Sequence, residues 1–334
     1  MTKHWAISFI AIAICAAFFG IAALAPSAAE TVTDFPTQPI QIVVPFAPGG
    51  NTDLIARIVA ERLQSALHSP VIVTTRPGAG TNIGAAYVAN SKPDGYTMLI
   101  GAPASFVVNQ FIYANLAYDP DTSFAPISLA AEFPNVLVVP PSLGVKSIQQ
   151  LIEKAKAEPG TLTYASSGIG TTSQLGEALF AQMANLNMLH VPYKGTSQSV
   201  QDLVADRVSM MIDNLGPLYP FIQSGQLIAL GVSTKEPVSL LPGVPPIASV
   251  LNGYSLSSWN VLALPAGTPK EIVSKLSAEC DRILHMPAVA DKFASFGSRP
   301  VGGTPEETIA FLKQERQRWE AAVKAAKITK GQFD

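Results

Sequence analysis

The chain has 334 residues, of which 48% are hydrophobic and 14% charged, and its formal net charge is −2 at pH 7. This length allows two domains of ordinary size with sizeable cores. The charge balance excludes the basic surface that nucleic-acid binding requires, so we expect no nucleic-acid partner.

Residues 1–29 are predicted to be a secretory signal peptide. Lys3 precedes an apolar run over residues 6–24, and Ser27-Ala28-Ala29 offers small residues for cleavage. The run is long for a signal peptide, so an uncleaved N-terminal anchor is the alternative. Cleavage would leave a periplasmic protein with 21 basic and 24 acidic residues, and with Cys280 as its single cysteine.

The first stretch of the mature chain predicts an anion-binding loop. Residues 40–44 are β-branched at every position but Gln41, which is typical of a buried strand. Pro45, Pro48 and two glycines then end this run in a loop. Asn51 and Thr52 then start an amphipathic helix that we expect to reach Leu67. Unpaired N–H groups and the helix dipole attract negative charge at such a helix start.

Two more strand–loop–helix units follow. Residues 71–75 form a predicted strand, and a glycine turn leads from it to a helix that starts near Asn82; residues 96–101 form another, followed by a loop with Ser105. Such units predict a parallel sheet with helices on both faces. Ligands of these sheets bind beyond the carboxyl ends of the strands, where all three loops lie.

The remaining chain predicts a second α/β lobe and a return to the first. Residues 124–140 read as a long strand that crosses between lobes, and residues 255–265 as the returning one. We therefore assign residues 30–132 to the first part of lobe 1, residues 133–254 to lobe 2, and residues 255–334 to the return strand and C-terminal helices of lobe 1. Two lobes joined by two strands would form a hinged clamp.

Five segments in order resemble one family: PIQIVVPFAPGGNTDLIARIVAERL, RPGAGTNIGAAYVANSKPDGYT, YASSGIGTTSQLGEALF, HVPYKGTSQSVQDLVADRVSMMIDN and LALPAGTP. They are similar to the Bug (TctC-like) family, the extracytoplasmic solute receptors of tripartite tricarboxylate transporters. The resemblance covers essentially the whole mature chain. It implies a type II periplasmic binding protein of the Venus-flytrap kind, with two α/β lobes, each a mainly parallel sheet flanked by helices, and two crossing strands as the hinge.

The resemblance also implies a monomeric receptor that delivers a small carboxylate to membrane permease subunits, without a cofactor. Its ligand-binding residues would lie on the cleft loops of both lobes. Matched onto this sequence they are Phe46, Ala47, Gly50, Asn51, Thr52, Thr81, Asn82 and Ser105 on lobe 1, and Ser166, Ser167, Gly170, Thr171, Thr172, Gly195, Thr196, Asp213 and Asn214 on lobe 2. Most are uncharged donors, which can hold an anion without a buried cation. Asp213 is the exception and would repel a dianion unless water or a proton intervenes.

Two other functions stay open from the sequence. A sensor would use the same clamp to present a carboxylate to a membrane signalling partner such as a sensor kinase. A secreted hydrolase would need a nucleophile, a base and an orienting group. The sequence has no G-x-S-x-G elbow, no paired-histidine or paired-cysteine metal spacing and no complete nucleotide motif. We therefore expect neither an enzyme nor a metal site.

Overall fold

The computed structural model describes residues 34–333, and the chain from Pro36 onward forms one compact unit. The expected signal peptide lies outside the described residues. Across residues 34–333, no helix combines the length and the apolar character that a membrane crossing needs.

One group of elements surrounds a parallel core of three strands, with β1 between β2 and β3. These elements and their bounds are β1 (Ile40–Val44), α2 (Asn51–Leu67), β2 (Val71–Thr75), α3 (Asn82–Ala89), β3 (Thr97–Gly101), α4 (Asn109–Ile112), α9 (Lys270–Leu284), α10 (Pro287–Ala294), β10 (Arg299–Gly302) and α11 (Pro305–Ala325). We call this group lobe 1.

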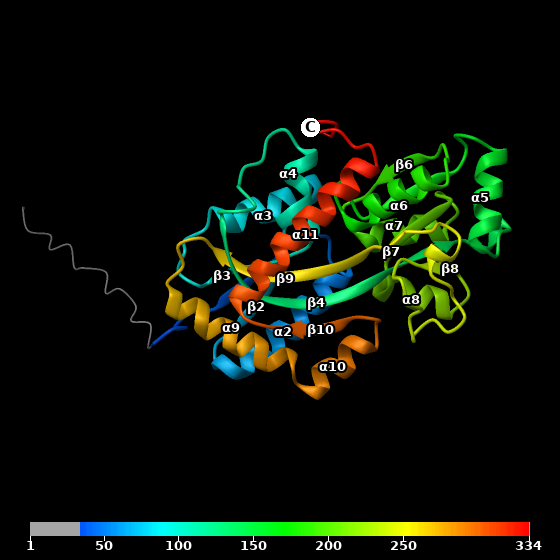
Figure 1. Cartoon of the computed structure of the whole chain (residues 1–334). Coiled ribbons are helices and arrows are strands. Elements are labelled where there is room, and N and C mark those ends of the chain that lie inside the picture. The colour runs from blue at the N-terminus through cyan, green and yellow to red at the C-terminus, as the bar shows by residue number, and fades with distance from the viewer. Residues whose placement is uncertain (1–33, 334) are drawn as a thin grey trace, which may run out of the picture. The chain divides into compact units, whose positions relative to one another are not determined.

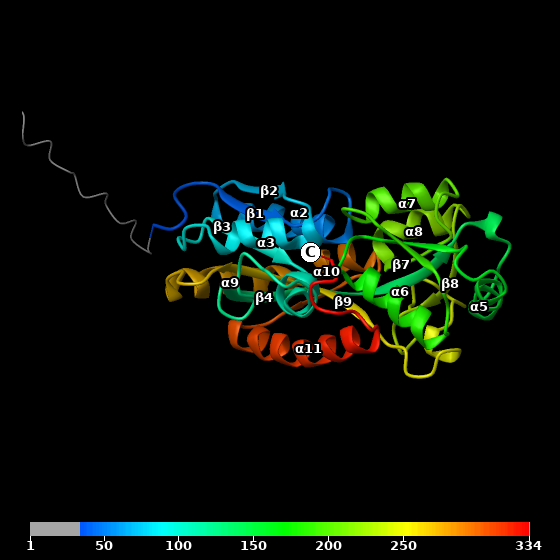
Figure 2. The same cartoon turned by 90° about the horizontal axis from the view of Figure 1, so that it is seen from above.

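A second group surrounds another parallel core, with β5 between β6 and β7. Its elements are α5 (Ile148–Ala157), β5 (Thr163–Ser166), α6 (Thr172–Met183), β6 (Leu189–Pro192), α7 (Thr196–Val204), β7 (Met210–Asn214), α8 (Leu215–Gln223) and β8 (Ile228–Val232). We call this group lobe 2, and Figure 2 shows its helices gathered apart from α2, α3, α9 and α11.

Two long strands connect the lobes, as the sequence pattern predicts. Strand β4 (Phe124–Val139) pairs antiparallel with β9 (Ser257–Pro265) over its first part and with β7 and β8 over its second. Both strands run side by side across the molecule (Figure 1). The fold thus has two α/β lobes with β4 and β9 as crossing strands. Its division at residues 133 and 255 stays a prediction.

Two elements follow directly from clear local sequence patterns, an apolar run in β1 and a capping motif in α11. In β1 every residue but Gln41 is buried, in agreement with its apolar run. Helix α11 starts at a complete capping box, in which the Thr304 side chain accepts from the Glu307 N–H and the Glu307 carboxylate accepts from the Thr304 N–H. Helix α8 and strand β10 are not predicted, because Pro220 lies inside the helix and Pro300 inside the strand.

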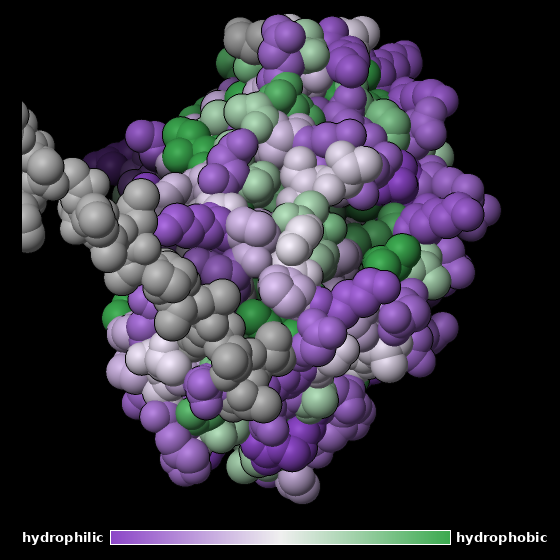
Figure 3. Space-filling view, turned by 90° about the vertical axis from the view of Figure 1, so that its left-hand side faces the viewer, coloured by the Kyte–Doolittle hydropathy of each residue, from purple (hydrophilic) through white to green (hydrophobic). Residues whose placement is uncertain are grey.

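Among residues 34–333, the exposed large apolar side chains are scattered over the surface. The large apolar side chains with the greatest exposure, Ile72, Ile83, Leu189 and Ile309, come from four different elements. The face in Figure 3 is mainly hydrophilic with small separate hydrophobic areas. Isolated exposed apolar residues are normal for a soluble domain, so a polar cavity is the better candidate for a ligand site.

Candidate functional site: a cavity at four helix N-termini

One cavity lies where four helices begin. Gly50, Asn51 and Thr52 belong to the start of α2, Thr171 and Thr172 to α6, Thr196 to α7, and Asn214 is the N-cap of α8. All of them line the cavity, together with Phe46, Ala102, Ser167 and Ser258. None of these lining residues carries a formal charge. The arrangement concentrates positive helix-dipole ends and unpaired N–H groups on one small space, which favours an anion.

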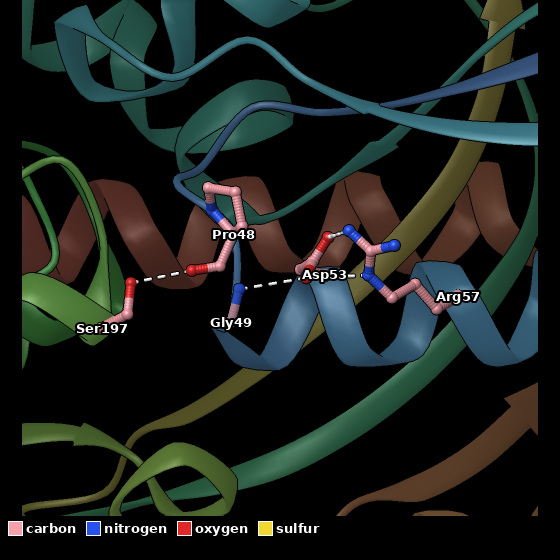
Figure 4. A network of polar contacts seen from close by, with 5 residues as sticks. All are labelled: Pro48, Gly49, Asp53, Arg57 and Ser197. Atoms are coloured by element: carbon pink, nitrogen blue, oxygen red, sulfur yellow. Dashed lines mark hydrogen bonds and ion pairs between the residues drawn. The ribbon is translucent and has the colours of Figure 1, made fainter.

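The loop before α2 is held by polar contacts on both sides (Figure 4). The buried Asp53 carboxylate accepts from the Gly49 N–H at 3.0 Å and pairs with the Arg57 guanidinium, with Nη2 at 3.0 Å from Oδ1. This pair neutralises the carboxylate next to the anion site. From lobe 2, the Ser197 hydroxyl donates to the Pro48 carbonyl at 2.8 Å. The loop is therefore fixed to its own helix and to the opposite lobe.

The lobes meet closely around the cavity. The Ala47 N–H of lobe 1 donates to the Lys194 carbonyl of lobe 2 at 3.1 Å. Gly170 of lobe 2 packs so tightly on Asn109 and Ile112 of lobe 1 that a Cβ there would overlap the Asn109 Oδ1. The cavity leaves about 20 Å³ for the centres of water molecules, enough for one or two waters. A metabolite-sized acid therefore enters this space only after the lobes separate or the lining shifts.

The hydroxyl groups of the lining have defined hydrogen-bond directions. Thr52 Oγ1 accepts from the Asn260 amide at 3.1 Å, so its own proton is free for the cavity. Thr171 is the N-cap of α6 and donates to the Gly168 carbonyl at 2.6 Å. Thr172 Oγ1 lies 3.3 Å from Ser258 Oγ on the crossing strand β9. Thr52 is thus a free donor, whereas Thr171 shapes its loop.

The structure brings together only part of the residue set implied by the family resemblance. Nine members line the cavity: Phe46, Gly50, Asn51, Thr52, Ser167, Thr171, Thr172, Thr196 and Asn214. The other eight are not part of its lining, and they are Ala47, Thr81, Asn82, Ser105, Ser166, Gly170, Gly195 and Asp213. Thr81 lines a neighbouring cavity of about 200 Å³ that shares Phe46, Ser167 and Thr171 with the first. Ser105 is fully buried and donates to Thr81 Oγ1 at 3.0 Å.

Sequence reasoning missed Ala102 and Ser258. Ala102 directly follows β3, so the rule that ligands bind beyond the carboxyl ends of strands points to it, although the hydroxyl of Ser105 drew the prediction further along the loop. Ser258 lies on β9, where the crossing strands pass the cavity. Ser258 could be identified only from the position of β9 between the lobes, and this position is known only from the three-dimensional arrangement of the two sheets.

A serine–histidine contact bears on the hydrolase alternative. Ser166 Oγ lies 2.6 Å from His190 Nε2, although the two are distant in sequence. Ser166 is fully buried and is not part of the cavity lining. Burial lowers the pKa of His190 to about 4, so the ring stays neutral at pH 7. Within the described residues, moreover, no cluster of three or more His, Cys, Asp and Glu side chains is arranged to hold a metal. The pair links strands β5 and β6 of lobe 2.

A groove larger than this cavity has the wrong charge for an anion. It measures about 760 Å³ on lobe 1, between α9, β10 and the start of α11. Asp281, Glu306 and Glu307 all line it. These carboxylates would repel a negative ligand, so the smaller cavity between the lobes is the better candidate.

Two buried carboxylates lie behind the lobe-2 wall of the cavity. Asp213 has no exposed surface, and burial raises its pKa to about 6 from an ordinary 3.8, although bonds from the Asn214 N–H, Thr196 and Ser167 oppose the shift. Burial also raises the pKa of Glu177 well above its ordinary value. The Glu177 Oε1 accepts from the Ile212 N–H at 2.7 Å. Both groups hold protons more tightly in the folded state than in the unfolded chain.

Asp213→Asn should therefore flatten the pH dependence of stability. A raised folded-state pKa adds stability that is complete below about pH 4 and is lost as pH rises through about 6. Two pKa units correspond to about 3 kcal/mol. The measurement is urea unfolding of both proteins between pH 3.5 and 7, with Asp291→Asn on exposed α10 as the control. Parallel curves for Asp213→Asn and the parent would show that Asp213 does not titrate in this range.

Comparisons with known proteins agree with this architecture. Residues 55–328 match the model of the tripartite tricarboxylate transporter family receptor, TctC. The protein BugT of Bordetella pertussis is 36% identical over 94% of this chain and 95% of its own. The structure of Rpa4515 of R. palustris with adipate has a TM-score of 0.87 at 36% identity, covering 89% of this chain and all of the other.

Two further solved structures are similar over nearly as much of the chain. The periplasmic binding protein BugD has a TM-score of 0.85 at 32% identity, over 89% of this chain and all of BugD. MatC from Rhodopseudomonas palustris with bound malate has a TM-score of 0.82 at 28% identity, over 86% of this chain and all of MatC. This family consists of solute-binding receptors and is not a class of enzymes. The chain belongs to the TctC family of tripartite tricarboxylate transporter receptors, which includes the Bug proteins.

Proposed function

We propose that this receptor captures a small carboxylate in the cleft and delivers it, in the periplasm, to the permease of a tripartite tricarboxylate transporter. The observation that carries the proposal is the convergence of the α2, α6, α7 and α8 N-termini on one cavity with an uncharged lining. Helix N-termini bind an anion with fixed backbone donors, so no cation has to be buried when the site closes. The relatives with adipate and malate support a carboxylate as the ligand.

Closure would proceed by bending of the two crossing strands. The anion first meets the start of α2 on lobe 1, where the first N–H groups of the helix and the Thr52 hydroxyl are donors. Lobe 2 then adds the starts of α6, α7 and α8. Contacts such as Ser197 to Pro48 and Ala47 to Lys194 secure the closed arrangement. The closed receptor is the form that the permease would recognise.

A thermal-shift screen tests the proposal. The mature protein is unfolded and refolded to remove carried ligand, and then heated with small mono-, di- and tricarboxylates and with their matched amides. A ligand that binds only the folded state adds about 2.7 kcal/mol of stability at a hundredfold excess over its Kd. We expect stabilisation by at least one acid and none by its amide. Equal stabilisation by acid and amide, or by no acid from folded protein, would contradict the proposal.

Thr52→Val should weaken acid binding by about 1–3 kcal/mol, because it removes a hydroxyl donor from a charged partner. The fold should tolerate the change, since Asn260 keeps its second acceptor, the Gly101 carbonyl at 3.1 Å. Calorimetric titration with the best acid of the screen measures the loss. Thr161→Val, on the exposed surface of lobe 2, is the control. Unchanged affinity in Thr52→Val would remove this hydroxyl from the site.

A further inference from the structure

The lobe-2 wall of the cavity is organised by a carboxylate that does not itself line it. Asp213 is fully buried near the end of β7, with Oδ2 at 2.9 Å from the Thr196 hydroxyl and Oδ1 at 2.7 Å from the Asn214 N–H. The Ser167 hydroxyl also bonds to it. Thr196, Asn214 and Ser167 all line the cavity. We call these three residues the Asp213 wall.

The direction of these hydrogen bonds determines which donors and acceptors the Asp213 wall can present to a ligand. An ionised carboxylate only accepts hydrogen bonds, so Thr196 must turn its proton toward Asp213. The oxygen lone pairs of Thr196 are then left for the cavity. Asn214 Oδ1 is a further acceptor, buried without a partner in the described structure. A donor group of the ligand would satisfy this acceptor.

The opposite side of the cavity adds a side-chain donor. Thr52 Oγ1 accepts from Asn260, so its proton is free to be donated to a ligand. The first turn of α2 adds N–H groups without partners in the helix. A carboxylate therefore suits the α2 side and the backbone N–H groups that begin α6, α7 and α8. The Thr196 hydroxyl oxygen and Asn214 Oδ1 offer acceptors on the same wall, so a donor group beside the carboxylate would find partners there.

We propose that the ligand carries a hydroxyl or ammonium group close to its carboxylate, and that the Asp213 wall selects this group. The receptor would thus prefer hydroxy acids or amino acids over the plain acids of the same skeleton. Asp213 is a positioning residue in this scheme, since it acts through Thr196 and Asn214. The inference rests on the proposed function and narrows its substrate class.

Matched pairs of acids test the inference on the refolded protein. The pairs are malate and succinate, aspartate and succinate, lactate and propionate, citrate and tricarballylate, and 2-hydroxyadipate and adipate, titrated by calorimetry at pH 7.5. We expect the hydroxylated or aminated member of the best-binding pair to bind at least tenfold more tightly. Binding of acids with equal affinity, or with preference for the plain acid, would overturn this inference alone. Binding of none would overturn it together with the proposed carboxylate function.

Two variants separate recognition by the wall from a structural role. Thr196→Val removes the acceptor, and the preference within the best pair should fall to about twofold or less. In Asp213→Asn the amide NH2 can donate to Thr196 Oγ1, which frees the hydroxyl proton for the cavity, so the preference should invert toward the plain acid. Thr161→Val, far from the wall, should keep the full preference.

The Thr196→Val result decides the inference even if Asp213→Asn does not fold. A merely structural role for Thr196 would lower the affinity for both members of a pair equally and leave their ratio unchanged. Circular dichroism and urea unfolding establish that each variant is folded before titration. A full preference in folded Thr196→Val would contradict selection by the wall.

Discussion

Gly170→Ala should weaken ligand binding at least tenfold while leaving the separate lobes folded. In the closed arrangement a Cβ at this position would overlap Asn109 Oδ1 and lie 2.7 Å from Ile112 Cδ1, both on the opposite lobe. These atoms cannot yield easily, because Asn109 Nδ2 is bonded to the Gly80 carbonyl at 2.7 Å and Ile112 is buried in the core. The variant would therefore oppose closure. Calorimetric titration measures the affinity, and small-angle scattering with ligand measures closure.

The chain provides a matched control for the backbone strain. Gly170 has φ +77°, so alanine there is strained whatever its neighbours are. Gly144 has φ +75°, and a Cβ added to it would meet no other atom within 4 Å. Gly144→Ala carries the same strain without the clash and should bind ligand normally. Equal affinities in the two variants would show that closure does not require the contact at Gly170.

Glu315→Ala should destabilise the protein by about 3–5 kcal/mol, since it leaves two buried donors without an acceptor. The Glu315 carboxylate on α11 accepts from Trp259 Nε1 at 2.6 Å and from Trp319 Nε1 at 2.8 Å. Both indoles are almost fully buried, and Trp259 belongs to the crossing strand β9. The bonds thus tie the C-terminal helix to the connection between lobes. Urea unfolding at pH 7 measures the loss.

Two other variants on α11 serve as controls for the loss of stability in Glu315→Ala. Glu315→Gln keeps a carbonyl oxygen for the indoles and should cost less than half as much. Glu320→Ala removes an exposed carboxylate paired with Lys324 and should change stability by less than about 0.5 kcal/mol. A Glu315→Ala variant as stable as Glu320→Ala would show that water replaces the lost acceptor.

Elements with strong local signals could be predicted from the sequence. Helix α2 begins at Asn51 and ends at Leu67, as the apolar period predicts, but the expected capping by Asn51 or Thr52 is wrong, because the N-cap is Gly50 and no side chain caps the helix. Strands β4 and β9 cross between the lobes, as their length and breaks indicate. Helix α8 could not be found this way, because its stability comes from packing Leu215 and Leu218 into lobe 2 against the effect of Pro220.

The site was predictable to the level of its loops and not of its side chains. The rule for strand ends points to Asn51, Thr52 and Thr172, which line the cavity. It cannot separate Asp213 from Asn214, whose side chains leave β7 on opposite faces. Only the three-dimensional pairing shows that Asp213 lies behind the wall and Asn214 in it. Ser258 was missed for the same reason.

The crystal structure of the refolded receptor with the best acid of the screen tests recognition by helix N-termini most directly. We expect one carboxylate of the ligand between the starts of α2 and α6, with its oxygens accepting from backbone N–H groups of Asn51, Thr52 or Thr172. No lysine or arginine should contact it. A carboxylate held by Lys194 at the neighbouring cavity, or bound outside the cleft, would contradict this mode of recognition.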